Sequence, residues 1–351
     1  MKKIFKLVLA LGLCLSLVAC ASSEKPKDDS TASDAKESAI TAVGVVIDTG
    51  GLGDHGYNDA VHKGAVTATT NLKLDLKVIE SKEVADYSNN IRSICNEGVQ
   101  VVVVAGSGFV DSLVEVSQEF PDVKFLIIDA SVEDQPNVSS VLFKEQEASF
   151  LLGAFAGLMT KANNVGYIAG IESPLQERAR VGFEAGYYSV KKSNDVKSVY
   201  TGTYKDVGKG KEIALSLFNG GADMVASFAG ACNLGLFEAV NEQKEGTWAL
   251  GAALGQFDKN PTRILASQVK TVDVLVANML EKVYNGQFEA GAVSNGIAEG
   301  GVDFMFNPDT ALVDGAVSAE VKAQIEELRG KVVSGEIKIP TTKEELAEFT
   351  K

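Results

Sequence analysis

The stretch VVIDTGGLGDHGYND, Val45–Asp59, decides how the fold is interpreted, because it joins an apolar strand to a glycine-rich loop. The strand is predicted over Val43–Asp48, and the loop from Gly51 to Gly56 has the spacing G-x-G-x-x-G. That spacing is typical of dinucleotide-binding proteins, in which an acidic residue further along binds the ribose. Glu80 lies roughly where that residue is expected. The motif alone would indicate a nicotinamide or flavin enzyme.

The first twenty residues have the pattern of an export signal. Three lysines precede an apolar run that is too short to span a membrane and remain there, and Leu17–Cys20 resembles a bacterial lipobox. Residues 20–39 are rich in Ser, Lys, Asp and Glu and predict a flexible tether. The alternative is an ordinary cleavable signal with an incidental Cys20. We expect residues 1–19 to be removed and acyl chains on Cys20 to hold the protein on the extracytoplasmic face of the cell membrane.

Composition narrows the class of partner. The net charge of −14 becomes −17 without residues 1–19, which carry three lysines and no acid, and such acidity argues against nucleic acid and anionic lipid as partners. Cys95 and Cys232 show no metal-ligand spacing, so we expect two unpaired small residues. His55 and His62 have no cluster of carboxylates or cysteines beside them at ligand spacing, so no metal site is expected. About 310 mature residues suit two domains.

Apolar β-rich runs alternate with amphipathic segments along the chain. The runs VQVVVVAG and VKFLIIDA are apolar on both faces, as a parallel sheet covered by helices requires. The predicted strands of a first block are Val43–Asp48, Leu76–Ser81, Val99–Ala105, Val123–Asp129 and Val138–Phe143. The predicted helices of that block are Asn58–Thr70, Tyr87–Glu97 and Phe109–Phe120.

The same alternation then repeats in a second block. The runs NVGYIAG, VKSVYTG, ADMVASFAG and WALGAA are its predicted strands, and its predicted helices are Leu175–Lys192, Gly208–Phe218 and Leu234–Glu245. The helix Glu147–Leu158 is expected near the crossover, and Val272–Tyr284 is expected to return to the first block. We therefore predict two doubly wound α/β domains, one of residues 40–143 with about 268–297, the other of residues 144–267 with about 298–351.

In open α/β sheets, ligands bind beyond the carboxyl ends of the strands. The residues predicted there are polar, aromatic or glycine, which is unusual for plain connections. Two such edges that face each other would form a cleft. The predicted ligand-binding residues are Asp48, Tyr57, Asn58, Ser107, Gly108, Asp129, Phe228, Gly230 and Lys270.

Three observations argue against a dinucleotide in the glycine loop. Cytoplasmic nucleotides are not available to an exported protein. The helix after the third glycine should begin with apolar residues, whereas Tyr57, Asn58 and Asp59 follow at once. The spacing is also weak evidence in a chain with 34 glycines. We therefore expect no cofactor.

The same loop resembles a more specific signature. DTGGLGDHGYND is similar to the D-x-G-x-x-x-D-x-S-F-N motif of the basic membrane protein family, the purine nucleoside receptor-like substrate-binding lipoproteins of ABC transporters. Five further stretches resemble motifs of the same family, in the same order and over nearly all of residues 40–305. They are ADYSNN, GSGFVDSLVEVSQEFPDVKFLIID, FKEQEASFLLGAFAGLMTKANNVGYIAG, RVGFEAGY and ADMVASFAGACNLGLFEAV. The resemblance implies a type I periplasmic-binding-protein fold. It also implies capture of a small solute, usually a purine nucleoside, for delivery to permease subunits.

The resemblance also implies roles for single residues. Asp48 would hydrogen-bond the base, and Tyr57 would stack on it with Asn58 beside. An aromatic plate contributes ~1–3 kcal/mol per stacked base. Asp129 and Lys270 would hydrogen-bond sugar hydroxyls. An opposing aromatic from the second domain is expected at Phe228.

One position departs from the family pattern. The family sequence I-G-V-D-x-D-Q appears here as LGAALGQ, residues 250–256, in which Gln256 is kept and both acids are replaced. The first acid, now Ala253, binds ribose hydroxyls in the nucleoside receptors. Its loss would weaken nucleoside binding by about one or two decades. The resemblance therefore implies the fold and the transport class more firmly than it implies the solute.

Simpler structural roles remain open for the same residues. Asp48 would cap a loop or helix, Tyr57 and Phe228 would be core aromatics, Asp129 would serve a turn, and Lys270 would be a solvated lysine at a helix start.

For the protein as a whole, an enzyme is disfavoured because the sequence lacks G-x-S-x-G, HExxH and a Cys/His pair. A monomeric importer component is the leading interpretation. The alternatives are a ligand sensor or surface adhesin of the same fold and a binder of another heteroaromatic solute such as a flavin.

Overall fold

The computed structural model describes residues 40–53, 56–191 and 196–350, which belong to one compact unit. The predicted signal, the tether, Cys20 and His55 lie outside the described residues. None of the described helices is long and apolar enough to cross a membrane.

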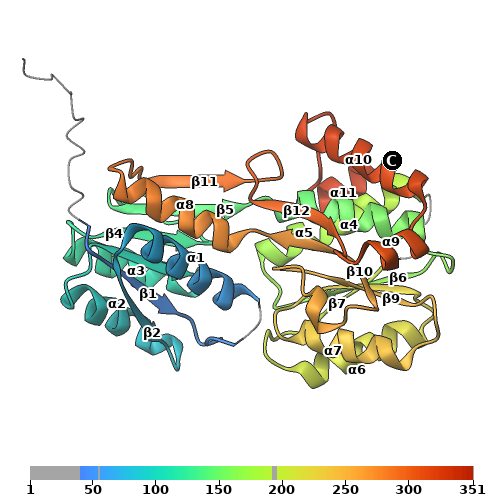
Figure 1. The fold of residues 1–351 in the computed structure, drawn as a ribbon, viewed down its shortest axis with the longest axis horizontal. Coiled ribbons are helices and arrows are strands. Elements are labelled where there is room, and N and C mark those ends of the chain that lie inside the picture. Colours follow the sequence, from blue (N-terminus) through green and yellow to red (C-terminus); the bar gives the residue numbers. More distant parts are fainter. Residues whose placement is uncertain (1–39, 54–55, 192–195, 351) are drawn as a thin grey trace, which may run out of the picture. The chain divides into compact units, whose positions relative to one another are not determined.

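Within the described residues, the first sheet has six parallel strands in the order β11-β5-β4-β3-β1-β2 (Figure 1). Both faces are covered, which explains why β1 is buried at all six positions. Val43, Val45 and Ile47 point into one core and Ala42 and Val46 into the other, as the twofold alternation of a strand requires. The strands are β1 (Ala42–Ile47), β2 (Asp75–Glu80), β3 (Val101–Ala105), β4 (Lys124–Ile128), β5 (Val138–Phe143) and β11 (Gly291–Asn295).

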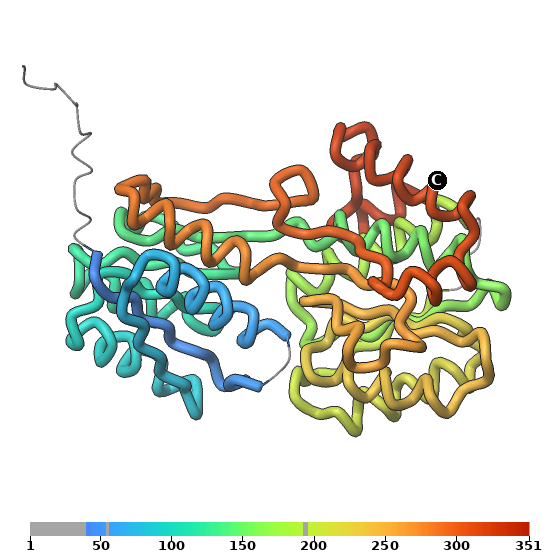
Figure 2. Tube along the Cα trace, viewed as in Figure 1, coloured from blue at the N-terminus to red at the C-terminus, as the bar shows by residue number. Residues whose placement is uncertain are grey.

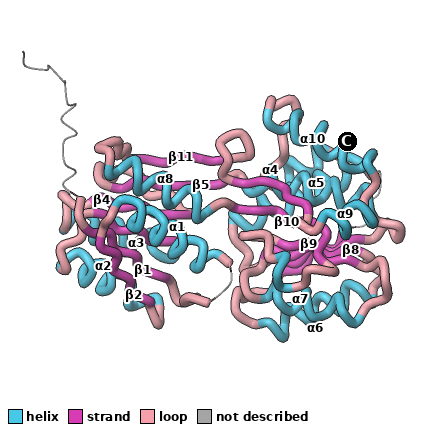
Figure 3. Tube along the Cα trace, in the orientation of Figure 1, coloured by secondary structure: helices cyan, strands magenta, loops and turns pink. Residues whose placement is uncertain are grey.

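Helices cover both faces of this sheet (Figure 3). One face packs on α1 (Tyr57–Leu72) and α8 (Val272–Tyr284), and the other on α2 (Tyr87–Asn96) and α3 (Val110–Glu119). The helix α8 therefore does return to the first block, as predicted from the sequence.

The second sheet also has six described strands, in the order β12-β10-β9-β8-β6-β7, and β12 alone among them runs antiparallel to its neighbour. One face packs on α4, α5 and α10, and the other on α6 and α7. The strands are β6 (Val165–Ala169), β7 (Val196–Tyr200), β8 (Met224–Phe228), β9 (Trp248–Gly251), β10 (Ile264–Lys270) and β12 (Val302–Phe306). The helices are α4 (Glu145–Met159), α5 (Pro174–Val190), α6 (Val207–Asn219), α7 (Cys232–Ala239), α9 (Thr310–Ala316), α10 (Ala319–Val333) and α11 (Lys343–Phe349).

The chain passes between the two sheets after β5, after β10 and after β11 (Figure 2). β10 stays paired in the second sheet through Lys270, and α8, which packs on the first sheet, begins at Val272. The α/β class and the two doubly wound sheets are confirmed.

Several predicted bounds need correction. The helix predicted over Leu234–Glu245 ends at Ala239 and continues as a 3-10 turn. The helix predicted over Glu147–Leu158 begins two residues earlier and packs in the core of the second sheet against α5. The described 3-10 turns are Val84–Asp86, Ser107–Phe109, Val240–Glu242 and Phe257–Lys259.

Candidate functional site

The predicted site residues lie where strands of the two sheets end. Asp48 follows β1, Tyr57 and Asn58 begin α1, and Ser107 and Gly108 lie in the turn after β3. Asp129 follows β4, Phe228 ends β8 with Gly230 just beyond, and Lys270 ends β10. The parallel strands explain this arrangement, because their carboxyl ends gather at one edge of each sheet.

Asp48 organises the glycine loop. Its Oδ1 accepts hydrogen bonds from the Gly50 amide at 2.6 Å and from Asn58 Nδ2 at 2.8 Å, and Asn58 Nδ2 also donates to the Gly51 carbonyl at 3.1 Å. The bond to the amide two residues on is an Asx turn, which is the structural role considered for this residue. Asn58 is buried, whereas Asp48 is half-buried, so the carboxylate stands between the loop and solvent.

Tyr57 ties the start of α1 to the end of β4. Its hydroxyl donates to the Ile128 carbonyl at 3.1 Å, and its half-buried ring lies 5.8 Å from Lys270 Nζ. Burial, and after it the negative charge of Asp129, raises the pKa of Tyr57 well above its usual value. The phenol therefore stays protonated, and its hydrogen bond to the Ile128 carbonyl holds the ring beside Lys270.

Four charged side chains, three of them buried and Arg178 25% exposed, form a group that we call the Lys270 cluster: Asp129, Glu145, Arg178 and Lys270. Lys270 Nζ lies 2.5 Å from Asp129 Oδ1 and 2.8 Å from Glu145 Oε1, and Arg178 Nε lies 2.8 Å from Glu145 Oε2. The side chains of Lys270, Asp129 and Glu145 are only 6%, 8% and 3% exposed. Because Asp129 follows a strand of the first sheet and Lys270 ends a strand of the second, the cluster joins the two sheets.

The charges of this cluster balance. Burial alone lowers the pKa of Lys270, but the carboxylates of Asp129 and Glu145 outweigh it and raise that pKa above its usual value. The ammonium also lies 4.3 Å from the centre of the Phe143 ring, an attractive cation–π contact. Lys270 is therefore not the solvated lysine that was the alternative.

Two residues beside the cluster adopt a left-handed backbone. Asp129 has φ +66° and Ala253 has φ +56°. Such residues cost free energy unless their surroundings hold them, and they concentrate at functional sites. The Lys270 amide donates to the Ala253 carbonyl at 2.8 Å, so the position that departs from the family pattern lies next to the lysine.

The loops at the end of the second sheet are held by an amide network. Asn233 Oδ1 accepts from the Ser227 hydroxyl at 2.6 Å and from the Ala229 amide at 2.9 Å. Asn233 Nδ2 donates to Gln256 Oε1 at 3.0 Å. The retained Gln256 therefore supports the loop that follows Phe228, which is half-buried and packs against the core of this sheet.

Sequence reasoning missed three residues that touch the site. Glu145 and Arg178 complete the Lys270 cluster. The third residue is Tyr87, whose hydroxyl accepts a hydrogen bond from the Thr49 amide at 3.2 Å. The Tyr87 ring stacks on Phe109, with 3.9 Å between the ring centres. Tyr87 belongs to the ADYSNN motif, which was the available signal. Glu145 lies in the FKEQEASFLLGAFAGLMTKANNVGYIAG stretch, which was the same kind of signal, whereas Arg178 lies outside the motifs that resemble the family.

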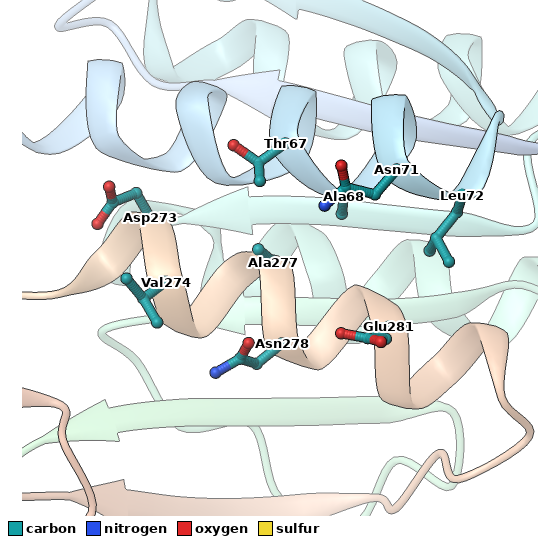
Figure 4. A pocket seen from close by; sticks show the side chains of 9 residues that line it. All are labelled: Thr67, Ala68, Asn71, Leu72, Asp273, Val274, Ala277, Asn278 and Glu281. Atoms are coloured by element: carbon teal, nitrogen blue, oxygen red, sulfur yellow. The ribbon is translucent and has the colours of Figure 1, made fainter.

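A groove of about 260 Å³ lies elsewhere, between α1 and α8 (Figure 4). Asp273 on its wall is paired with Lys63 at 2.7 Å. The groove shares no residue with the strand-end site, and its lining residues are Thr67, Ala68, Asn71, Leu72, Asp273, Val274, Ala277, Asn278 and Glu281. Among the described residues, no three His, Cys, Asp or Glu side chains are grouped to hold a metal ion.

Two doubly wound sheets, with functional groups at the strand ends of both, define a two-lobed solute-binding protein. The chain matches the family model of ABC transporter substrate-binding proteins, PnrA-like, over residues 41–343, and it belongs to that family. It is therefore a substrate-binding protein of ABC transporters and not an enzyme.

Known proteins similar to this chain agree with that assignment. The ABC transporter nucleoside-binding protein BmpA of Lactococcus lactis subsp. cremoris is 28% identical and aligns over 97% of this chain and 100% of its own. An uncharacterized lipoprotein of Pyrococcus abyssi is 31% identical, over 76% of this chain and 70% of its own. A solute-binding protein of an ABC transporter system from Aeropyrum pernix K1 has a similar crystal structure, with a TM-score of 0.81 and 26% identity, covering 88% of this chain and 98% of its own.

Proposed function

We propose that this protein captures a nucleoside-like solute, first of all a purine nucleoside, between its two lobes and delivers it to the permease subunits of an ABC importer. The observation that carries the proposal is the convergence of Asp48, Asn58 and Tyr57 with the Lys270 cluster. The name of the similar nucleoside-binding protein BmpA supports the same class of solute.

Each part of the site suits one part of a nucleoside. The Tyr57 ring offers a stacking surface for the base, and Phe228 is the aromatic proposed to oppose it. Asp48 offers an acceptor to the edge of the base, which carries both donors and acceptors, and the buried Asn58, whose Nδ2 donates to Asp48, is proposed to hold that acceptor in place. Asp129 and Lys270 are proposed to bind the sugar hydroxyls. At the strand ends, Gly108 and Gly230 are proposed to contact the solute through their backbone, and Ser107 through its hydroxyl.

The charge balance favours a neutral solute. Both cations of the Lys270 cluster are already matched by Asp129 and Glu145, and Asp48 adds a further acid nearby. A phosphate group would have to displace one of these carboxylates, at the cost of leaving a buried charge without its partner. We therefore expect nucleosides to bind more tightly than the corresponding nucleotides.

Calorimetry on residues 21–351 tests the proposal with inosine, guanosine, adenine, riboflavin, glucose and inosine monophosphate. We expect saturable binding of at least one purine nucleoside and weaker binding of the monophosphate. Tyr57→Leu should weaken nucleoside binding by about tenfold or more, because it removes the stacking surface. The matched control is Tyr284→Leu, a half-buried tyrosine at the end of α8. Binding of glucose alone, with no heteroaromatic compound bound, would contradict the proposal.

We also propose that acyl chains on Cys20 anchor the monomeric protein on the extracytoplasmic face of the membrane. The lipobox-like Leu17–Cys20 supports this, as does the similar archaeal protein that is named a lipoprotein. Cells fed an acyl-chain analogue should label the wild-type chain, whereas Cys20→Ser should be unlabelled and released from the membrane. A labelled Cys20→Ser variant would contradict the anchor.

A further inference from the structure

Tyr204 is an aromatic residue at the strand-end edge of the second sheet that no motif in the sequence singled out. It lies in the loop between β7 and α6, and 38% of it is exposed, which makes it one of the more exposed large side chains that are described. An exposed aromatic ring at this edge presents a planar apolar surface that a ring-containing ligand can cover.

The surroundings of Tyr204 hold it in place. Its ring lies against Gly170, where any side chain would overlap the ring. Gly230 has φ +60°, and a Cβ there would lie 2.9 Å from the Tyr204 carbonyl oxygen. That carbonyl accepts a hydrogen bond from the Ala231 amide at 2.8 Å. The ring is therefore fixed by the loops that follow β6 and β8, and binding would not have to order it.

The position of Tyr204 relates it to the proposed site. Phe228 pairs in register with Ala169, and Gly170 is the next residue, so the ring on Gly170 lies at the same edge of the sheet as Phe228. The neighbouring Lys205 donates through Nζ to the Thr49 carbonyl, directly after Asp48 in the chain. Burial, with the negative charge of Asp129 among the further causes, raises the pKa of Tyr204. Tyr204 thus lies on the side of the second sheet that meets the Asp48 loop of the first.

We propose that Tyr204 is a specificity-determining contact for the planar ring of the solute, in addition to Tyr57 and Phe228. The ring of Tyr204 packs against the part of the base nearest the Asp48 loop, so it distinguishes rings of different size and substitution at that edge. This inference rests on the proposed function, and it specifies how the second sheet contributes to recognition of the base rather than of the sugar.

The test compares Tyr204→Leu, Tyr204→Phe and the control Tyr284→Leu by calorimetry with the purine nucleoside that the wild type binds best. We expect Tyr204→Leu to weaken binding by roughly tenfold, Tyr204→Phe to keep most of the affinity, and the control to be unchanged. Circular dichroism melts of all three variants check that each remains folded.

A second readout does not depend on affinity. Protein labelled with 3-fluorotyrosine should show a fluorine resonance, assigned by its loss in Tyr204→Phe, that shifts when the nucleoside saturates the site. Unchanged affinity in a folded Tyr204→Leu, or an unmoved Tyr204 resonance, would overturn the inference while leaving the proposed function intact. Absence of any nucleoside binding by the wild type would overturn the proposed function and this inference with it.

Discussion

The central cation of the Lys270 cluster and its two carboxylates have distances similar to those of a second group, around Arg92, that lies in very different surroundings. In the first sheet's outer layer, Arg92 on α2 lies 2.6 Å from Glu115 and 2.6 Å from Glu119 on α3, with the side chains 28%, 58% and 43% exposed. Lys270 has its two carboxylates at 2.5 and 2.8 Å, with every side chain less than a tenth exposed. Distances alone would rank the two clusters as equals, whereas burial separates them.

The difference in burial shows which of the two groups needs a functional explanation. An exposed ion network gains little because water already solvates its members. A buried one must offset the cost of removing each charge from water, and apolar residues of the same size are often at least as stable. The Arg92 group links neighbouring helices on one face, but the Lys270 cluster links the strand ends of two sheets. Its retention at that place favours a role in holding a ligand or in setting how the lobes meet.

The largest effect is expected when the central cation of each cluster is removed. Lys270→Met leaves Asp129 and Glu145 buried with only Arg178 to compensate them, which should reduce the free energy of unfolding by about 3–5 kcal/mol. The deficit should shrink in mild acid, because protonating a buried carboxylate removes the uncompensated charge. Urea denaturation followed by circular dichroism measures both effects.

Arg92→Met is the matched control for that experiment. Its carboxylates remain in water after the change, so we expect the urea midpoint to move far less than in Lys270→Met. Equal losses in the two variants would break the comparison, since burial would then not be what distinguishes the clusters.

The comparison also shows what the sequence could predict of the site. Asp129 ends an apolar run that predicts a strand, and the ends of parallel strands are where ligands bind. Lys270 was expected at such an edge too, and the ligand role of both residues came from the family resemblance. Glu145 and Arg178 were not found, because Glu145 lies before the helix predicted over Glu147–Leu158 and Arg178 is one of several polar positions of the helix predicted over Leu175–Lys192. Glu145 is 125 residues from Lys270, and no local pattern reports a contact over such a separation.

For the fold, too, the sequence predicted some elements and missed others. The nine strands from β1 to β9 lie on or within a few residues of the predicted apolar runs, and the interior ones do so because burial on both faces requires continuous apolar sequence. β10 was not among the predicted strands. β11 and β12, with the sequences GAVSN and VDFMF, were also missed. Both are sheet-edge segments with exposed positions, but so are β2 and β7, which were predicted. The C-terminal helices α9 to α11 follow β12 and were predicted only as a tail of the second domain.

A substitution at Ala253 sharpens the comparison. The Ala253 carbonyl accepts a hydrogen bond from the Lys270 amide at 2.8 Å, so the residue lies next to the Lys270 cluster. A new carboxylate at residue 253 would therefore stand beside a cluster whose charges already balance. Asp tolerates the left-handed backbone of this position, φ +56°, better than most residues. If the site holds a ribose, the hydroxyl pair can satisfy the added acid, and Ala253→Asp should increase the preference for inosine over 2′,3′-dideoxyinosine by roughly tenfold. Calorimetry with both nucleosides measures that preference.

Ala253→Asn is the control for Ala253→Asp, since it has the same shape and backbone tolerance without the charge, and we expect it to gain less than the acid does. A folded Ala253→Asp that leaves the preference unchanged would mean that the side chain at residue 253 does not meet a sugar. A wild type that already prefers inosine by roughly a hundredfold would mean that Asp129, Lys270 or another group already binds the diol fully. In the first case the Lys270 cluster would have to be explained by how the lobes meet, and in the second case the site would need no acid at residue 253 to hold a ribose.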